Sequence, residues 1–193
     1  MDKKQYKGYI APGKVFGPIY FAGVHSASTH IIDTGDGRIL IDPGFPDTLW
    51  IVLDNIKELG FGLKDIKKIV ITHGHYDHAG GVKELTVLCG AETYIGKDDF
   101  KMVTGEEDTA LSDDPGYRYK YSFTPDVLLS DTDTISLGFR SPSRKDLRSK
   151  ALSLFSAASE QVTLVPVFLQ KISHRFTVPP FPKKVTLSLP VRL

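Results

Sequence analysis

The chain has 193 residues, of which 41% are hydrophobic and 24% charged, values typical of one globular domain, or a domain with an appendage, that can bury a core. Its single cysteine, Cys89, excludes an internal disulfide and a multi-cysteine metal site, and we expect a buried thiol rather than a nucleophile. The sequence has no run of roughly 20 apolar residues and no apolar stretch behind its N-terminus, so we expect a soluble, cytoplasmic protein with no membrane partner.

The net charge of +1 is the sum of two unlike parts. Residues 1–138 carry 14 basic and 21 acidic side chains, a net charge of −7, whereas residues 139–193 carry 10 and 2, a net charge of +8. All 17 glycines lie at or before Gly138. We therefore expect two segments, 1–138 and 139–193, and we expect the function to depend on the first.

Apolar periodicity and turn residues predict alternating strands and helices in the first segment. In chain order, the expected elements are strands over 15–24, 28–33 and 38–42, a helix over 47–59, a strand over 68–72, a helix over 81–88, a strand over 92–95, a short helix over 97–102, and strands over 127–129 and 134–137. The strands before and after residues 34–37 should form a hairpin. The apolar strand over 68–72 should be covered on both faces. The last two strands should lie on either side of a turn. The polar residues 105–122 should leave the core.

The second segment has weaker patterns. A helix could begin near Ser143 and carry Leu147, Leu154 and other apolar residues on one face. Residues 162–170 are apolar, but Pro166 argues against a central strand. Residues 185–193 alternate between apolar and other side chains, as a strand would.

Three histidines and a carboxylate lie within six residues, directly after the strand expected over 68–72. His73 and His75 project to the same side of an extended segment, and Asp77 and His78 follow where the chain turns toward the next helix. Imidazole nitrogen and carboxylate oxygen are ligands for borderline divalent ions such as zinc, and without cysteine a catalytic site is favoured over a closed structural one. A solvated loop is the alternative, which the position at the end of a buried strand disfavours. A glycine at position 74 lets the backbone pass close to a neighbour.

The pattern His-x-His-x-Asp-His, formed here by His73, His75, Asp77 and His78, resembles the signature of the metallo-β-lactamase superfamily of metal-dependent hydrolases. Residues 28–44 resemble that family's opening hairpin and its strand ending in Leu-Ile-Asp-x-Gly. The resemblance covers about residues 15–138. It implies an α+β fold, the αβ/βα sandwich of the family, with its N-terminal half in this part of the chain.

Carried over residue by residue, the resemblance implies that His73 and His75 hold one metal ion, and that Asp77 and His78 hold, or help to hold, a second. The expected cofactor is zinc, as one or two ions, with iron or manganese as alternatives. Asp42 would lie beneath the site and orient a ligand, although it could equally cap the turn that follows it.

The chemistry expected from such a site is hydrolysis. A divalent metal lowers the pKa of bound water toward ~7 and polarises the bond that the resulting hydroxide attacks. Asp77 would act as the catalytic residue by orienting that water or taking its proton. The bond would be an ester, thioester, lactam, amide or phosphodiester in a small-molecule substrate, because a segment with a net charge of −7 disfavours nucleic acid.

The second segment departs from the family. Members of the family complete the site with a histidine after a Pro-Gly turn, an aspartate after a glycine and a final histidine, whereas residues 139–193 contain one histidine, His174, and no glycine. We therefore interpret 139–193 as a divergent tail, the product of a truncated or frameshifted second half, with a genuine second half as the alternative. His174 could complete one of the two half-sites, although a surface histidine is favoured. Two functions stay open: a metal-dependent hydrolase, or a catalytically incomplete protein that binds a partner through its basic tail.

Overall fold

The computed structural model describes residues 2–107, 122–137, 161–164 and 184–188. The chain forms two compact units, one made of Met1–Asp33 and Gly37–Ser130 and the other of Thr34–Asp36 and Asp131–Leu193. The boundary near Ser130 lies a few residues before the one expected from composition, which stays a prediction.

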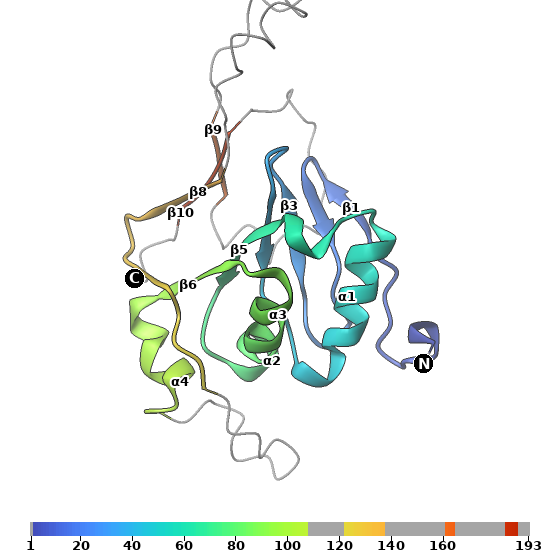
Figure 1. Ribbon diagram of the computed structural model, residues 1–193, viewed down its shortest axis with the longest axis horizontal. Coiled ribbons are helices and arrows are strands. Elements are labelled where there is room, and N and C mark those ends of the chain that lie inside the picture. The colour runs from blue at the N-terminus through green and yellow to red at the C-terminus, as the bar shows by residue number, and fades with distance from the viewer. Residues whose placement is uncertain (1, 108–121, 138–160, 165–183, 189–193) are drawn as a thin grey trace, which may run out of the picture. The chain divides into compact units, whose positions relative to one another are not determined.

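A seven-stranded mixed sheet forms the centre of the first unit (Figure 1). Its strands follow one another in chain order: β1 (Gly13–Phe16), β2 (Ile19–Phe21), β3 (His30–Asp33), β4 (Arg38–Ile41), β5 (Ile66–Ile71), β6 (Glu92–Gly96) and β7 (Val127–Leu129). The first four strands pair in antiparallel fashion and β4 to β7 pair in parallel. The parallel part places the carboxyl ends of β4, β5 and β6 at one edge of the sheet, where sites of open α/β sheets form.

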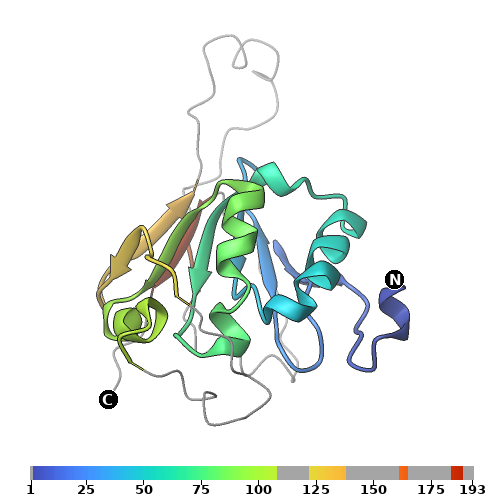
Figure 2. The ribbon, with the colours of Figure 1, turned by 60° about the horizontal axis from the view of Figure 1, so that its bottom comes forward.

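The helices of this unit are α1 (Leu49–Glu58), α2 (Tyr76–Ala79), α3 (Val82–Cys89) and α4 (Phe100–Thr104), with short 3-10 turns over Lys3–Gln5, Pro46–Thr48, Leu63–Asp65 and Lys97–Asp99. Figures 1 and 2 show α1 and α3 on the same face of the sheet. Their apolar sides and that face share one core, which includes Ile31, Leu40, Ile69, Ile71 and Ile95 from the strands, Ile51, Val52 and Ile56 from α1, and Val82 and Leu85 from α3. This mixed sheet with helices confirms the predicted α+β class.

Most of the predicted elements of the first segment are present, with ends shifted by one or two residues. The hairpin of β3 and β4 is confirmed, and α1 ends just before Gly60 as predicted. The strand expected to be covered on both faces is β5, in which Ile69, Val70 and Ile71 are all buried. Cys89 is a buried free thiol, as expected, and its burial raises the pKa of the thiol.

The single strand predicted over 15–24 is wrong. The structure has a hairpin of β1 and β2 instead, with Gly13 paired to Phe21. Gly17 lies between the strands with φ of +52°, a left-handed conformation that glycine adopts without strain. Pro18, which follows it, has no N–H to donate to a strand ladder. The Gly-Pro pair therefore breaks an otherwise apolar stretch into two short strands.

The strands predicted over 127–129 and 134–137 are both present, and they belong to different sheets. The first is β7, which pairs with β6, and the second is β8 (Thr134–Leu137), which belongs to another sheet. Asp126 explains the position of β7, because its Oδ2 accepts hydrogen bonds from the Thr93 amide at 2.8 Å and the Thr93 hydroxyl at 2.7 Å. The start of β7 is thereby fixed beside β6.

The second unit contains a three-stranded sheet. Its central strand, β10 (Lys184–Ser188), runs antiparallel to β8 and parallel to β9 (Gln161–Leu164). β9 is an edge strand, in agreement with the expectation that this apolar stretch is not a central strand. The predicted helix after Ser143, most of the polar residues 105–122 and His174 lie outside the described residues.

The described helices are all too short or too polar to cross a membrane. The cytoplasmic location stays a prediction.

The N-terminal turn is joined to α1 by a buried polar contact. Lys3, which is 6% exposed, places its amine 2.8 Å from Asn55 Oδ1 and 2.6 Å from Glu58 Oε2. Asn55 is fully buried and its amide donates to the carbonyl oxygens of Ala22, at 2.9 Å, and Gly23. One side chain of α1 therefore holds both the N-terminus and the loop after β2.

We expect Asn55→Ala to lower the free energy of unfolding by about 2–3 kcal/mol, because the substitution leaves buried polar groups without partners. Urea unfolding followed by circular dichroism measures this change. Lys57→Ala, at an exposed position on the same helix, is the control and should change it by no more than about 0.5 kcal/mol. Equal effects of the two substitutions would contradict the role assigned to Asn55.

Candidate metal centre

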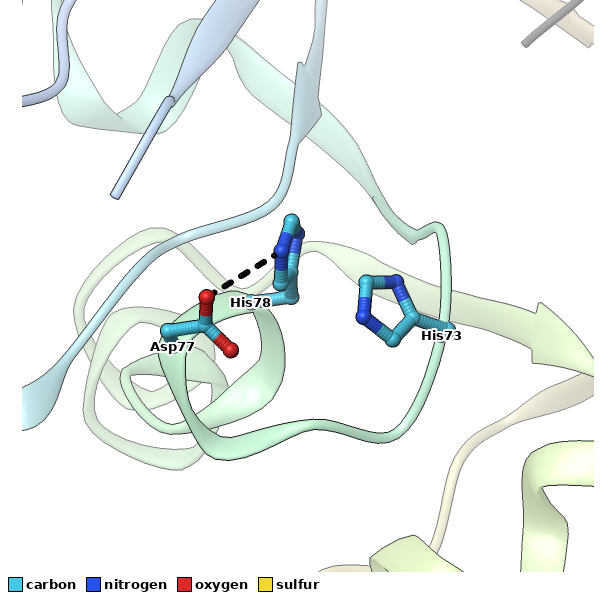
Figure 3. A group of neighbouring side chains, drawn as sticks. All are labelled: His73, Asp77 and His78. Atoms are coloured by element: carbon cyan, nitrogen blue, oxygen red, sulfur yellow. Dashed lines mark ion pairs between the residues drawn. The ribbon is translucent and has the colours of Figure 1, made fainter. Parts of the chain in front are cut away.

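The predicted site residues lie on a segment that leaves the sheet at the end of β5. His73 follows the last residue of β5 by two positions, and α2 begins after His75, whose carbonyl oxygen accepts the amide of Ala79 at 2.9 Å. Asp77 and His78 are part of α2, a helical turn that the sequence did not predict. The chain thus folds back within five residues, so that Asp77 and His78 face His73 (Figure 3).

His73, Asp77 and His78 form a compact group of metal-binding atoms. Each offers one ligand atom that lies within 4.8 Å of those of the other two. The Asp77 Oδ2 atom is 3.4 Å from His78 Nε2, the ion pair that Figure 3 marks, and the ring centroids of His73 and His78 are 4.0 Å apart. Two imidazoles and one carboxylate form a donor set that catalytic zinc sites use, with further coordination positions left for water and substrate.

His75 adjoins this group. Its ring centroid is 4.5 Å from that of His73, with the two planes at 75°. The structure therefore brings together all four residues of the motif, and residues that the resemblance assigns to two different ions are close enough to hold one. The division of the four residues between two ions stays a prediction.

Asp42 lies beneath the group and contacts Thr72 and His78. Its carboxylate, on a residue only 5% exposed, accepts the Thr72 amide at 2.8 Å through Oδ1, and through Oδ2 it contacts the Thr72 hydroxyl at 2.8 Å and His78 Nδ1 at 2.9 Å. With Nδ1 bound to Asp42, His78 has Nε2 left for a metal ion. Among the described residues, Asp42 is the non-glycine residue with positive φ, +52°, a strained conformation typical of functional sites.

Thr72 is a site residue that the sequence analysis missed. Its hydroxyl donates to Asp42, and the same oxygen lies 3.1 Å from His73 Nδ1, from which it can accept a hydrogen bond. This contact leaves Nε2 of His73 for a metal ion, as the Asp42 contact does for His78. In the sequence, only the position of Thr72 between a buried strand and the first histidine of the motif could have indicated this role.

The pKa values of His73 and His78 are shifted in opposite directions. Burial lowers the pKa of His73, and the neighbouring His78 and His75 lower it further, so this ring favours the neutral form that binds metal. Burial acts in the same direction on His78, but the hydrogen bond to Asp42 and the charges of Asp42 and Asp77 outweigh it and raise the pKa of this ring. An excess of negative charge thus surrounds His78, which suits a site for a cation.

The other histidines of the described chain lie elsewhere. His25 is exposed, and His30 is half-buried with its ring edge-on to Phe21, the centroids 5.7 Å apart. Burial lowers the pKa of His30. His25 is therefore a surface side chain and His30 a packed one, and neither belongs to the group of His73, Asp77 and His78.

Comparison with known proteins points to one family. The family model described as the metallo-beta-lactamase superfamily matches residues 22–147. Among curated proteins, the chain is 35% identical over 71 residues to the probable metallo-hydrolase YflN of Bacillus subtilis, covering 36% of this chain and 26% of YflN. It is 28% identical over 99 residues to a hydroxyacylglutathione hydrolase of Shewanella halifaxensis, covering 50% of this chain and 33% of the relative.

Solved structures agree. The FEZ-1 metallo-β-lactamase of Legionella gormanii matches with a TM-score of 0.62 and 27% identity, over 68% of this chain and 50% of that enzyme. The chain therefore spans about half the length of that enzyme, and a third or less of the two curated relatives. The matched part contains the hairpin of β3 and β4, Asp42 and the whole histidine motif. These matches confirm the predicted fold, and the chain belongs to the metallo-β-lactamase superfamily.

Proposed function

We propose that this protein is a metal-dependent hydrolase whose metal ion, zinc in the first place, is held by His73, Asp77 and His78. The observation that carries the proposal is the approach of these three ligand atoms to within 4.8 Å of one another. Both histidines of the group have Nδ1 next to an oxygen of Thr72 or Asp42, which leaves Nε2 for the ion. The donor set therefore fits zinc in kind and in number.

The residues around the ion would have different roles in hydrolysis. When bound, the ion would supply a water of lowered pKa and polarise the bond to be cleaved. Asp77 would bind the ion through one oxygen and orient the water, or accept its proton, through the other. His75 would extend the donor set on the side of His73, where a second ion is expected. Asp42 would keep the ring of His78 in place.

We infer that the substrate is a small molecule with an ester, thioester, lactam or similar bond. The net charge of −7 on residues 1–138 supports this choice, because a nucleic-acid substrate favours a basic surface. The relative named as a hydroxyacylglutathione hydrolase supports hydrolysis of a small acyl compound.

The metal-free chain should bind zinc, and His73→Ala and His78→Ala should weaken that binding by more than the roughly 10–100-fold that loss of an outer partner costs. Zinc titration against a chromophoric chelator measures the affinity, and hydrolysis of a generic thioester measures activity, which His75→Ala should abolish. His25→Ala removes an exposed histidine and serves as the control. Equal zinc affinity in the wild type and in His73→Ala would refute the proposed site.

Asp42→Asn should weaken zinc binding by about 10–100-fold, because an amide supplies one acceptor oxygen where the carboxylate contacts both Thr72 and His78. Asparagine tolerates a positive φ, so the backbone at this position can persist. Asp47→Asn, at an exposed carboxylate five residues away, is the matched control and should leave zinc affinity unchanged. The same titration decides the matter, and an Asp42→Asn affinity equal to that of the control would show that Asp42 only caps its turn.

A further inference from the structure

The peptide between the first two histidines of the motif is held from outside the motif. The Gly74 amide donates a hydrogen bond to Asp99 Oδ1 at 3.1 Å. Asp99 lies 25 positions along the chain, half-buried, directly before α4. The mechanism proposed above gives Asp99 no role, yet its carboxylate contacts the backbone from which His73 and His75 project.

The same helix packs closely against this peptide. A Cβ atom added to Gly74 would lie 2.7 Å from Cβ of Met102 and 3.4 Å from the carbonyl oxygen of Asp99. The first distance is shorter than carbon atoms tolerate, and Met102 Cβ is fixed to the helix backbone, so it cannot rotate away. Only glycine fits between His73 and His75 while α4 stays in this position.

α4 is itself anchored. Val103 is fully buried in the core, and its carbonyl oxygen accepts the amide of Phe123 at 2.9 Å. At the end of the helix, the carbonyl oxygen of Lys101 accepts the amides of Glu106 and Glu107. Met102 lies within this helix and Asp99 directly before it, so both approach Gly74 from an element that is fixed near its carboxyl end.

These contacts restrict the backbone at Gly74, the residue between His73 and His75. Glycine is the residue with the greatest conformational freedom, so a glycine between two ligands would leave their relative orientation loose in the metal-free protein. A hydrogen bond to its amide fixes the plane of the peptide that joins it to His73, and the packing of Met102 limits the backbone on the other side. Ligands held in advance bind metal more tightly than ligands that must be ordered on binding.

We propose that Asp99 is a positioning residue for the metal site: together with Met102 it clamps the Gly74 peptide and so fixes the spacing of His73 and His75. The proposal rests on the proposed function, since it concerns the same ligands. Its physical basis is the acceptor oxygen of Asp99 rather than its charge, and the two can be separated by substitution.

Zinc titration of the full-length, metal-free protein tests the clamp with three variants. Asp99→Ala removes the acceptor and should weaken zinc affinity by about tenfold or more. Asp99→Asn keeps an acceptor oxygen and removes the charge, and should restore affinity to within about twofold of the wild type. Asp98→Ala removes the exposed neighbouring carboxylate and should leave affinity unchanged. Equal losses in Asp99→Asn and Asp99→Ala would assign the effect to charge and overturn the clamp.

A second measurement reports the clamp without metal. Amide hydrogen exchange of Gly74, followed by NMR, should be slow in the metal-free wild type and in Asp99→Asn, and at least about tenfold faster in Asp99→Ala. Unchanged circular dichroism and urea midpoint would show that the variant is folded. Equal exchange in all three proteins overturns the proposal whatever the zinc affinity.

The outcomes for this proposal and for the proposed function differ. Zinc binding that is tight in the wild type and equally tight in Asp99→Ala overturns the clamp and leaves the hydrolase proposal in place. Failure of the wild type to bind zinc overturns both. Weak binding in Asp99→Ala, with rescue in Asp99→Asn and slow Gly74 exchange only where an acceptor is present, supports the clamp.

Discussion

The site depends on one buried carboxylate. Asp42 follows β4, and its oxygens contact the Thr72 amide and hydroxyl after β5 and His78 Nδ1 on α2. Its own amide donates to the carbonyl oxygen of Val70, which continues the β4–β5 ladder by one residue. A carboxylate buried this far is stable only with such partners. The hydrogen bonds of this carboxylate therefore join the end of β4 to the segment after β5 and to α2, which carry the proposed ligands.

Parallel strand order makes this arrangement possible. β4, β5 and β6 end at the same edge of the sheet, so the residues that follow them are neighbours although they are far apart in sequence. Asp42 follows the first of these strands, the motif follows the second, and Asp99 follows the third after a short turn. The three connections supply, in that order, the carboxylate beneath the proposed ligands, the proposed ligands themselves and the contact to the peptide between His73 and His75. The apolar core of the sheet and of α1 and α3 fixes where these connections begin.

Sequence alone predicted those parts of the fold and site that depend on local spacing. The period of α1, the hairpin of β3 and β4 and the four residues of the motif all lie within short windows where side-chain periodicity determines the structure. Several of the features that the sequence did not reveal depend on contacts between distant residues. The roles of Thr72 and Asp99 require knowledge of which strand ends are adjacent, and the position of β7 depends on a hydrogen bond between Asp126 and Thr93 across 33 residues. The β1–β2 hairpin was missed for a local reason, since apolar residues on both sides outweighed the Gly17–Pro18 turn.

The proposed site lies entirely in the acidic one of the two segments into which charge divides the chain. The proposed ligands and the residues that contact them all lie between Asp42 and Asp99, within the segment that carries the net charge of −7. The three proposed ligand atoms lie together without a contribution from residues 139–193, because α2 folds Asp77 and His78 back onto His73 within one helical turn. In the proposed function, binding of the ion and completion of a catalytic site would therefore be separate requirements. The first depends on a local fold that Asp42 and its partners hold together, and the second depends on how a substrate and its water are arranged around the ion once it is held.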